Sequence, residues 1–326
     1  MMSASTRRVS IRMAVVCGTA VLALSSAAIL IRWSNAPALT IAFYRLAGAA
    51  VVLLLLAGGD RWRSYRLQNH HRLPAKAGNR RGTAAAAAGV ALSGLFLAGH
   101  FGLWIASLRV SSVAISVLLV SLHPLLVGLV GGVIGDRLPR RFVPALLLVL
   151  PGTALTVFGG VRGTVGATTG GMLLALGGAV MMSGYLLCGR RLRQQMGNLV
   201  YAGGTYLCGA VALALLARVA DIPLRGFAWQ EYALFAGLAL VPTLLGHTLL
   251  NWALRHMPAA GVSLVYLGEP VGAAVLAALL LGELPGAVVV AGGVLILGGL
   301  YLIVTGSGQE LRARQGHRSQ ERPRAE

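Results

Sequence analysis

Two ionisable side chains stand directly before prolines in otherwise apolar stretches of the sequence. His123 precedes Pro124 and Glu269 precedes Pro270, and the two pairs lie 146 residues apart. An ionisable group inside an apolar segment is costly unless it is paired or hydrated, so both are candidate functional groups. A glutamate there can hold a substrate amine or bind a proton, and histidine exchanges protons near neutral pH. Either can instead serve packing alone, through a hydrogen bond to a neighbouring helix.

Further polar and aromatic residues recur at helical spacing. His100 and Trp104 are four residues apart, as are His247 and Asn251. Residues at this spacing share one face of a helix, and a polar face is unfavourable toward lipid. We therefore expect both pairs to face inward, where they would line a cavity or hydrogen-bond between helices.

Three more residues complete the predicted substrate or proton pathway. Tyr44 and Arg45 stand together in an apolar run, where Arg45 can bind a substrate carboxylate or extend its charge outward as a structural residue. Tyr266 lies one turn before Glu269 and offers an aromatic wall.

Three prolines lie inside apolar runs, at Pro124, Pro242 and Pro270. Proline removes a backbone donor and kinks a helix, so each is a predicted helix kink. We predict no catalytic residues, cofactor or metal site. The acidic residues are scattered along the chain, the cysteines form no metal-ligand spacing, and no Walker A motif for ATP is present.

The elements that must position these residues follow from composition. Of 326 residues 56% are hydrophobic and only 11% are charged, whereas a soluble domain carries about 25% charged residues. A lipid-facing surface needs no charges. The formal net charge of +19 raises the question of nucleic-acid binding, but the charges sit in short segments between long apolar runs. The composition therefore indicates a membrane protein that does not bind nucleic acid.

Apolar runs divide the chain into segments long enough to cross a bilayer. A crossing needs about 20 apolar residues, and backbone amides in lipid must be satisfied within their own helix. The sequence predicts ten transmembrane helices, at 13–31, 37–58, 83–105, 110–134, 142–162, 169–189, 199–220, 231–253, 258–281 and 285–305.

The basic residues favour one orientation of these ten predicted helices. With the N-terminus inside, 22 of the 28 Lys and Arg residues fall on the cytoplasmic side and five on the outer side, while Arg45 lies within a span. Because positive residues gather on the cytoplasmic side, both termini are predicted to be cytoplasmic. The stretch 59–82 is then a cytoplasmic loop.

The second half of the chain repeats features of the first at the 146-residue offset. Leu108-Arg109 matches Leu254-Arg255, and Pro139 matches Pro285. Five helices per half is an odd number, so the halves enter the membrane in opposite directions, as in many secondary transporters. We predict an all-α, polytopic membrane protein with ten transmembrane helices in two inverted five-helix repeats. Its segments are a cytoplasmic N-terminus (1–12), two repeats (13–163 and 164–305) and a disordered cytoplasmic tail (306–326).

The repeated motifs resemble those of the drug/metabolite transporter superfamily, specifically EamA-type transporters with two EamA repeats. The resemblance spans about residues 13–305 and is carried by three motifs: Ala42-Phe43-Tyr44-Arg45, Pro124 with Gly135-Asp136-Arg137-Leu138-Pro139, and Leu267-Gly268-Glu269-Pro270 with Leu281-Gly282-Glu283-Leu284-Pro285. The first repeat departs from the family pattern by placing His123 before its proline. The resemblance implies transport of metabolites, amino acids or drugs, often as proton-linked export.

The expected function is therefore secondary active transport, in which alternating access exports a small molecule across the bacterial inner (cell) membrane. The partners would be the substrate, protons and the lipid bilayer, and the sequence leaves a homodimer open. Two other classes stay in view. A membrane-embedded enzyme acting on lipid-linked substrates would need clustered acids or metal ligands, and a channel would need a continuous pore.

Overall fold

Helices make up the regular secondary structure of the part of the chain that the computed structural model describes. The described residues are 4–68, 80–110, 116, 119–133, 138, 140–159, 168–269, 271–272, 276, 279, 286–288, 290–299 and 301–302. The predicted kink at Pro270, the tail 306–326 and the matched motif at 281–285 lie outside them.

Six segments among the described residues are long and apolar enough to cross a membrane. They agree in position with six of the ten predicted runs, which confirms a multi-pass membrane protein. The helices that carry them are α1 (Ala4–Trp33), α2 (Ala38–Gln68), α3 (Arg80–Val110), α7 (Thr169–Gln195), α8 (Asn198–Val219) and the continuous series α9 (Trp229–Leu238), η1 (Ala239–His247) and α10 (Thr248–Ala253).

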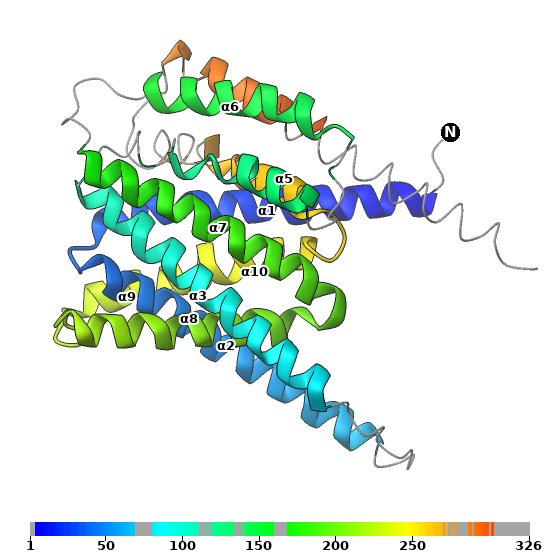
Figure 1. Ribbon diagram of the computed structural model, residues 1–326, viewed down its shortest axis with the longest axis vertical. Coiled ribbons are helices and arrows are strands. Elements are labelled where there is room, and N and C mark those ends of the chain that lie inside the picture. The colour runs from blue at the N-terminus through cyan, green and yellow to red at the C-terminus, as the bar shows by residue number, and fades with distance from the viewer. Residues whose placement is uncertain are drawn as a thin grey trace, which may run out of the picture.

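Shorter apolar helices lie where the other four runs were predicted. These are α5 (His123–Val133), α6 (Phe142–Gly159), α11 (Ala259–Tyr266) and the helix Val290–Gly299. Figure 1 shows α6 beside the helix Val290–Gly299, and α6 also contacts α11. The backbones of α6 and Val290–Gly299 are in close contact, because a Cβ added to Gly152 would lie 2.7 Å from the carbonyl oxygen of Gly292.

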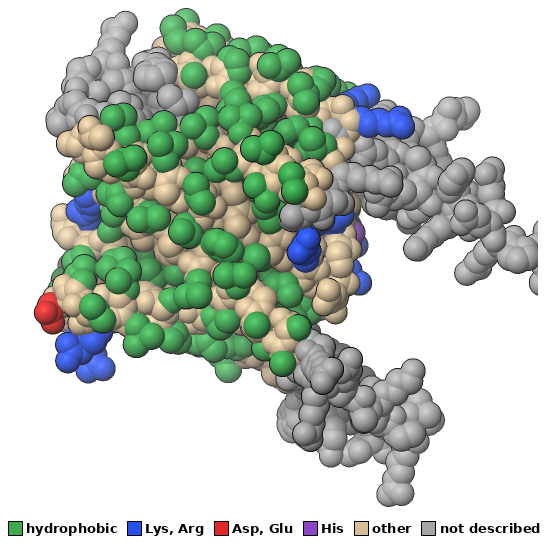
Figure 2. Space-filling model, viewed as in Figure 1, with side chains coloured by type: hydrophobic (Ala, Val, Ile, Leu, Met, Phe, Trp, Pro, Cys, Tyr) green, Lys and Arg blue, Asp and Glu red, His purple; other side chains and the backbone are tan. Residues whose placement is uncertain are grey.

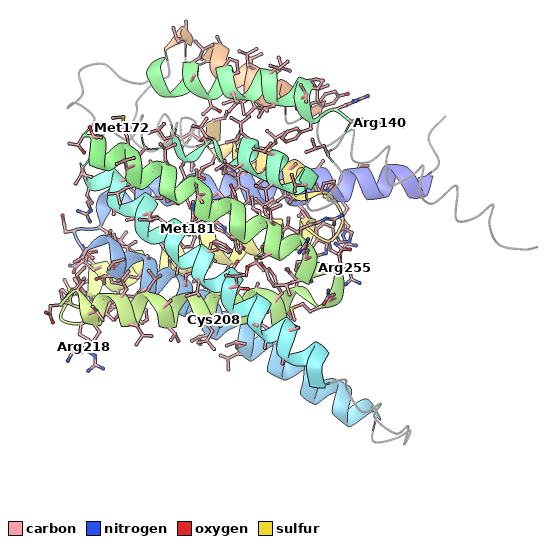
Figure 3. All side chains as sticks on the ribbon, viewed as in Figure 1. Arg140, Met172, Met181, Cys208, Arg218 and Arg255 are labelled. Atoms are coloured by element: carbon pink, nitrogen blue, oxygen red, sulfur yellow. The ribbon has the colours of Figure 1, made fainter. Side chains whose placement is uncertain are left out.

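The molecular surface has the pattern expected of a protein in lipid. Large apolar side chains such as Leu129, Val133 and Leu147 are mostly exposed. Figure 2 shows hydrophobic side chains across the face in view, with basic side chains near its two ends. Figure 3 places Arg218 at one end of the helices and Arg140 and Arg255 at the opposite end. We call these the Arg218 end and the Arg255 end.

Helices from the two halves of the sequence pack against one another. The most extensive contacts join α3 to α7 and α2 to α8, and α1 packs along η1 and α10. Glycines allow a close approach where Gly94 of α3 faces Gly209 of α8. A Cβ added to Gly209 would lie only 3.0 Å from the carbonyl oxygen of Gly94. The core is thus made between the halves rather than within each one.

The structure corrects three expectations about helix boundaries. α2 continues to Gln68, so the predicted loop 59–82 is partly helical, and Figure 1 shows α2 and α3 projecting together beyond the other helices. The predicted helix 231–253 contains the π-helical segment η1 around Pro242. In the predicted helix 258–281, Glu269 follows a turn instead of lying mid-helix.

Candidate functional site

One buried cavity gathers most of the predicted pathway residues. It measures about 50 Å³ as the space open to the centres of water molecules, which is room for about four waters. Seven of the nine predicted residues line it: Arg45, His100, Trp104, His123, His247, Tyr266 and Glu269. The remaining lining residues are Leu24, Ala27, Phe101, Val120, Ser121, Met182 and Leu267.

Two of the predicted helices are interrupted where they reach the cavity. A turn at Ser121–Leu122 precedes His123, and a turn at Leu267–Gly268 precedes Glu269. Both turns carry the same three-residue backbone hydrogen bonds at the 146-residue offset. Leu122 N donates to Leu119 O and Leu125 N to Leu122 O, and correspondingly Gly268 N donates to Val265 O and Val271 N to Gly268 O. Discontinuous helices of this kind place backbone and side-chain polar groups at binding sites of transporters.

A serine from another helix stabilises the backbone at each interruption. Ser25 of α1 donates to the carbonyl of Glu269 at 3.1 Å, and Ser183 of α7 donates to the carbonyl of His123 at 3.3 Å. Each hydroxyl also contacts the carbonyl four residues earlier in its own helix, at 2.7 Å for Ser25 and 2.8 Å for Ser183. The two interruptions therefore share their support as well as their backbone geometry.

Arg45 is held in the cavity wall by residues of both halves. Its Nε donates to Thr243 Oγ1 at 3.1 Å, and its guanidinium lies 3.8 Å from the ring centre of Phe101. Thr243 in turn donates to the carbonyl of Leu238 at 2.8 Å. Because the Thr243 hydroxyl donates to that carbonyl, its lone pairs are left to accept from Arg45. The side chain of Arg45 thus points inward rather than toward the membrane surface.

Two donors in the cavity wall are left without partners. Arg45 Nη1 and Trp104 Nε1 are both buried and have no hydrogen-bond partner among the described residues. Arg45 is 1% exposed and Trp104 6% exposed. An unmatched buried donor costs about 1–3 kcal/mol, so this wall favours an occupant with acceptor oxygens.

The histidines and Tyr266 form a polar and aromatic lining around these donors. His100 Nδ1 hydrogen-bonds the carbonyl of Gly178 at 3.0 Å, and its ring stacks on Trp104 with 5° between the planes. His247 Nδ1 lies 3.0 Å from the hydroxyl of Tyr266. His100, Trp104 and His247 therefore face the cavity.

Glu269 brings the opposite charge to the same cavity as Arg45. Its side chain is half-buried and lies at the interruption between α11 and the residues that follow. A carboxylate and a guanidinium around one small cavity create a site that suits a solute with separate positive and negative groups.

Two predicted pathway residues lie outside the cavity. Asn251 is fully buried, accepts from the hydroxyl of Tyr185 at 2.6 Å and donates to that of Tyr206 at 3.3 Å, so it joins α10 to α7 and α8. Tyr44 lies near the Arg218 end, where its hydroxyl donates to the carbonyl of Leu224 at 2.7 Å and its ring stacks on Phe235. Both act in helix packing in this structure.

The prolines occupy different local settings. Pro124 is the second residue of α5, directly after the turn, where a missing N–H breaks no helical hydrogen bond. Pro242 lies within η1, among wider π-helical turns. The turn at Ser121–Leu122 lies within the four residues before Pro124, where a proline ring crowds the preceding backbone.

Several site residues carried no sequence signal. Phe101, Met182 and Leu24 line the cavity, and Thr243 positions Arg45, yet each is an ordinary residue of a transmembrane helix. Phe101 directly follows His100, but neighbours in sequence point to different faces of a helix. Only their partners from distant segments identify them.

Long apolar helices around a polar cavity define a multi-pass membrane protein. Residues 169–305 match the EamA-like transporter family, which suggests a membrane transporter. A crystal structure described only as that of a protein is similar over 89% of this chain and 96% of its own, with a TM-score of 0.70 and 22% identity. That likeness supports the fold alone. No curated protein sequence matches the chain.

Proposed function

We propose that the protein is a proton-coupled secondary transporter that exports small metabolites, amino acids or drugs by alternating access. The observation that carries this proposal is the single cavity in which Arg45 and Glu269 lie with three histidines. The free donors on Arg45 and Trp104 favour a solute with a carboxylate, and Glu269 favours a solute with an amine or a bound proton.

The proposed architecture is ten transmembrane helices in two inverted repeats, residues 13–163 and 164–305. Supporting it are the matching hydrogen bonds at the two interruptions and the equivalent roles of Ser25 and Ser183. Three of the five helix pairs that the repeat makes equivalent pack together, namely α2 with α8, α5 with α11 and α6 with Val290–Gly299. Such pairing is expected around a two-fold axis in the membrane plane.

The proposed orientation places the Arg255 end in the cytoplasm, together with both termini, and the Arg218 end outside. Arg140 and Arg255 were predicted inside and Arg218 outside, and Figure 3 shows them at opposite ends. The proposed location is the bacterial inner membrane, in keeping with the positive-inside rule.

The size of the cavity bears on how a solute would bind. A volume of about 50 Å³ is small for a typical metabolite. Binding a solute of that size would therefore require the helices around the cavity to move apart.

The test begins with the exported solute. The medium and cytoplasm of cells with and without the protein are compared by mass spectrometry, and the solute that differs is used in proteoliposomes with an imposed pH gradient. We expect flux to follow the gradient, and Glu269→Gln to remove that dependence. Flux indifferent to the gradient, or unchanged in Glu269→Gln, would reject the proton coupling.

A matched control is available at the surface. Asp221 is exposed beside Arg218 at the Arg218 end, and it has a positive φ of 50° that asparagine also adopts readily. Asp221→Asn removes one acidic charge outside the cavity and should leave gradient-driven flux unchanged.

A further inference from the structure

His123 bridges two segments that are far apart in the sequence. It is the first residue of α5, is 5% exposed and lines the cavity. Its Nδ1 lies 2.9 Å from the carbonyl oxygen of Val120, and its Nε2 lies 3.2 Å from the carbonyl oxygen of Ser263 in α11. The imidazole therefore joins the interrupted helix of the first half to α11 of the second.

Both partners of the ring are carbonyl oxygens, and carbonyl oxygens only accept hydrogen bonds. A neutral imidazole has one N–H, so it can donate to one of the two and must turn a lone pair toward the other. An imidazolium has two N–H groups and donates to both. The surroundings of His123 thus match the donor pattern of the protonated ring. Among the contacts of the described residues, His100 has one carbonyl partner and His247 contacts the hydroxyl of Tyr266.

The groups around His123 include one acid and one permanent cation. α11 contributes Tyr266, whose ring centre is 6.0 Å from that of His123, and α7 contributes Ser183, which does not titrate. The titratable and charged side chains that share the cavity with His123 are Tyr266, His100, His247, Arg45 and Glu269. Glu269 is the counter-charge that would accompany an imidazolium in this cavity.

We propose that His123 is a proton-binding latch: as an imidazolium it ties α5 to α11 through Val120 and Ser263, and loss of the proton releases one of the two ties. The latch rests on the proposed transport function, because it regulates the cavity through which the solute would pass. It assigns the closing proton to His123 and leaves Glu269 to contact the solute or supply the counter-charge.

The ring itself gives a direct test. The purified full-length protein, labelled with ¹⁵N in its histidine rings, is reconstituted in lipid nanodiscs and titrated from acidic to alkaline pH by NMR. We expect an imidazolium signal with both ring nitrogens protonated that is lost in His123→Gln and kept in His256→Gln. If His123→Gln does not fold, each of the other six histidines is replaced in turn. A signal that remains in all six variants then belongs to His123. A ring of His123 that is neutral wherever the protein is folded would overturn the latch.

The link to stability is a second test. The two-donor state exists at low pH, so the melting temperature of wild type should exceed that of His123→Gln most at acidic pH. This difference should shrink as the pH rises and the imidazolium signal disappears. A difference that is independent of pH would show a packing role only and would reject the latch.

Failure of the latch and failure of the proposed function are distinguishable. The NMR and melting experiments contain no solute, so they decide the latch alone. Gradient-driven flux of the exported solute decides transport. Flux in wild type together with a neutral His123 would retain the transporter and discard the latch.

Discussion

The Nε of Arg45 in α2 donates a hydrogen bond to Thr243 Oγ1 in η1 at 3.1 Å, across 198 residues of sequence. This contact fixes a cation in the cavity wall, and Nη1 has no hydrogen-bond partner in the described part of the chain. Arg45→Lys keeps the charge but loses the planar group above Phe101 and the Nε donor, and a buried cation–π contact is worth about 2 kcal/mol. We expect affinity for a carboxylate solute to fall at least tenfold, as measured by solute-induced fluorescence or calorimetry. Arg218→Lys, on an exposed side chain, is the control and should leave affinity unchanged.

Asn251 provides a contrast, because its contacts are structural. Asn251→Ala removes the partner of the Tyr185 hydroxyl and one partner of Tyr206, at a cost of about 1–3 kcal/mol. We expect a lower melting temperature in detergent, with solute affinity of the folded fraction close to that of wild type. A large loss of affinity at unchanged stability would place Asn251 in the binding site after all.

The contact between α3 and α8 depends on Gly94. A Cβ at this position would lie 2.7 Å from both Cys208 Cβ and the carbonyl oxygen of Thr205, so Gly94→Ala must push the helices apart. Overpacking of this kind costs about 1–3 kcal/mol, which should appear as a lower melting temperature. Gly18→Ala is the matched control, since nothing lies within 4 Å of its added Cβ. Equal stability of the two variants would contradict the close approach.

Glu231 links two segments at the Arg218 end. Its carboxylate accepts from Ser34 Oγ at 2.5 Å and from the backbone N of Asn35 at 2.8 Å, which ties the start of α9 to the connection between α1 and α2. Glu231→Ala should raise the population open at this end by about tenfold, which corresponds to about 1.4 kcal/mol.

The readout is a cysteine placed at Ala36, which is 1% exposed beside this contact. In a background without the native cysteines, labelling of Ala36→Cys by a membrane-impermeant maleimide should accelerate when Glu231→Ala is added. An unchanged labelling rate would mean that Glu231 does not hold this end closed. Asp221→Asn again serves as the neighbouring acidic control.

Much of the fold follows from local patterns that the sequence displays. Apolar runs locate the six long helices, because each helix satisfies its own backbone and needs only length and hydrophobicity to cross a bilayer. The 146-residue offset also related His123 to Glu269, and the structure gives both positions the same preceding turn. The ten-span count, the orientation and the repeat boundaries stay predictions, because they depend partly on segments outside the described residues.

The sequence predicted kinks at Pro124 and Pro270, but not the turns at 121–122 and 267–268. An apolar run continues across each turn, so hydropathy predicts one unbroken helix. A proline indicates a kink but does not show at which residue the helical hydrogen bonds end. The support comes from Ser25 and Ser183 on other helices. Local sequence patterns do not show which residues of distant helices will form these hydrogen bonds.

Local sequence patterns were enough to locate the membrane helices and the polar residues that must face inward, because exposure of a charge to lipid is unfavourable. Which of those residues meet depends on the packing of the helices. The folded structure places Arg45 in the same cavity as Glu269. It places Asn251 and Tyr44 in hydrogen bonds to other segments, outside the cavity. The reason is physical: helical spacing fixes which face a residue occupies, whereas the partner of that face depends on how all the helices pack together.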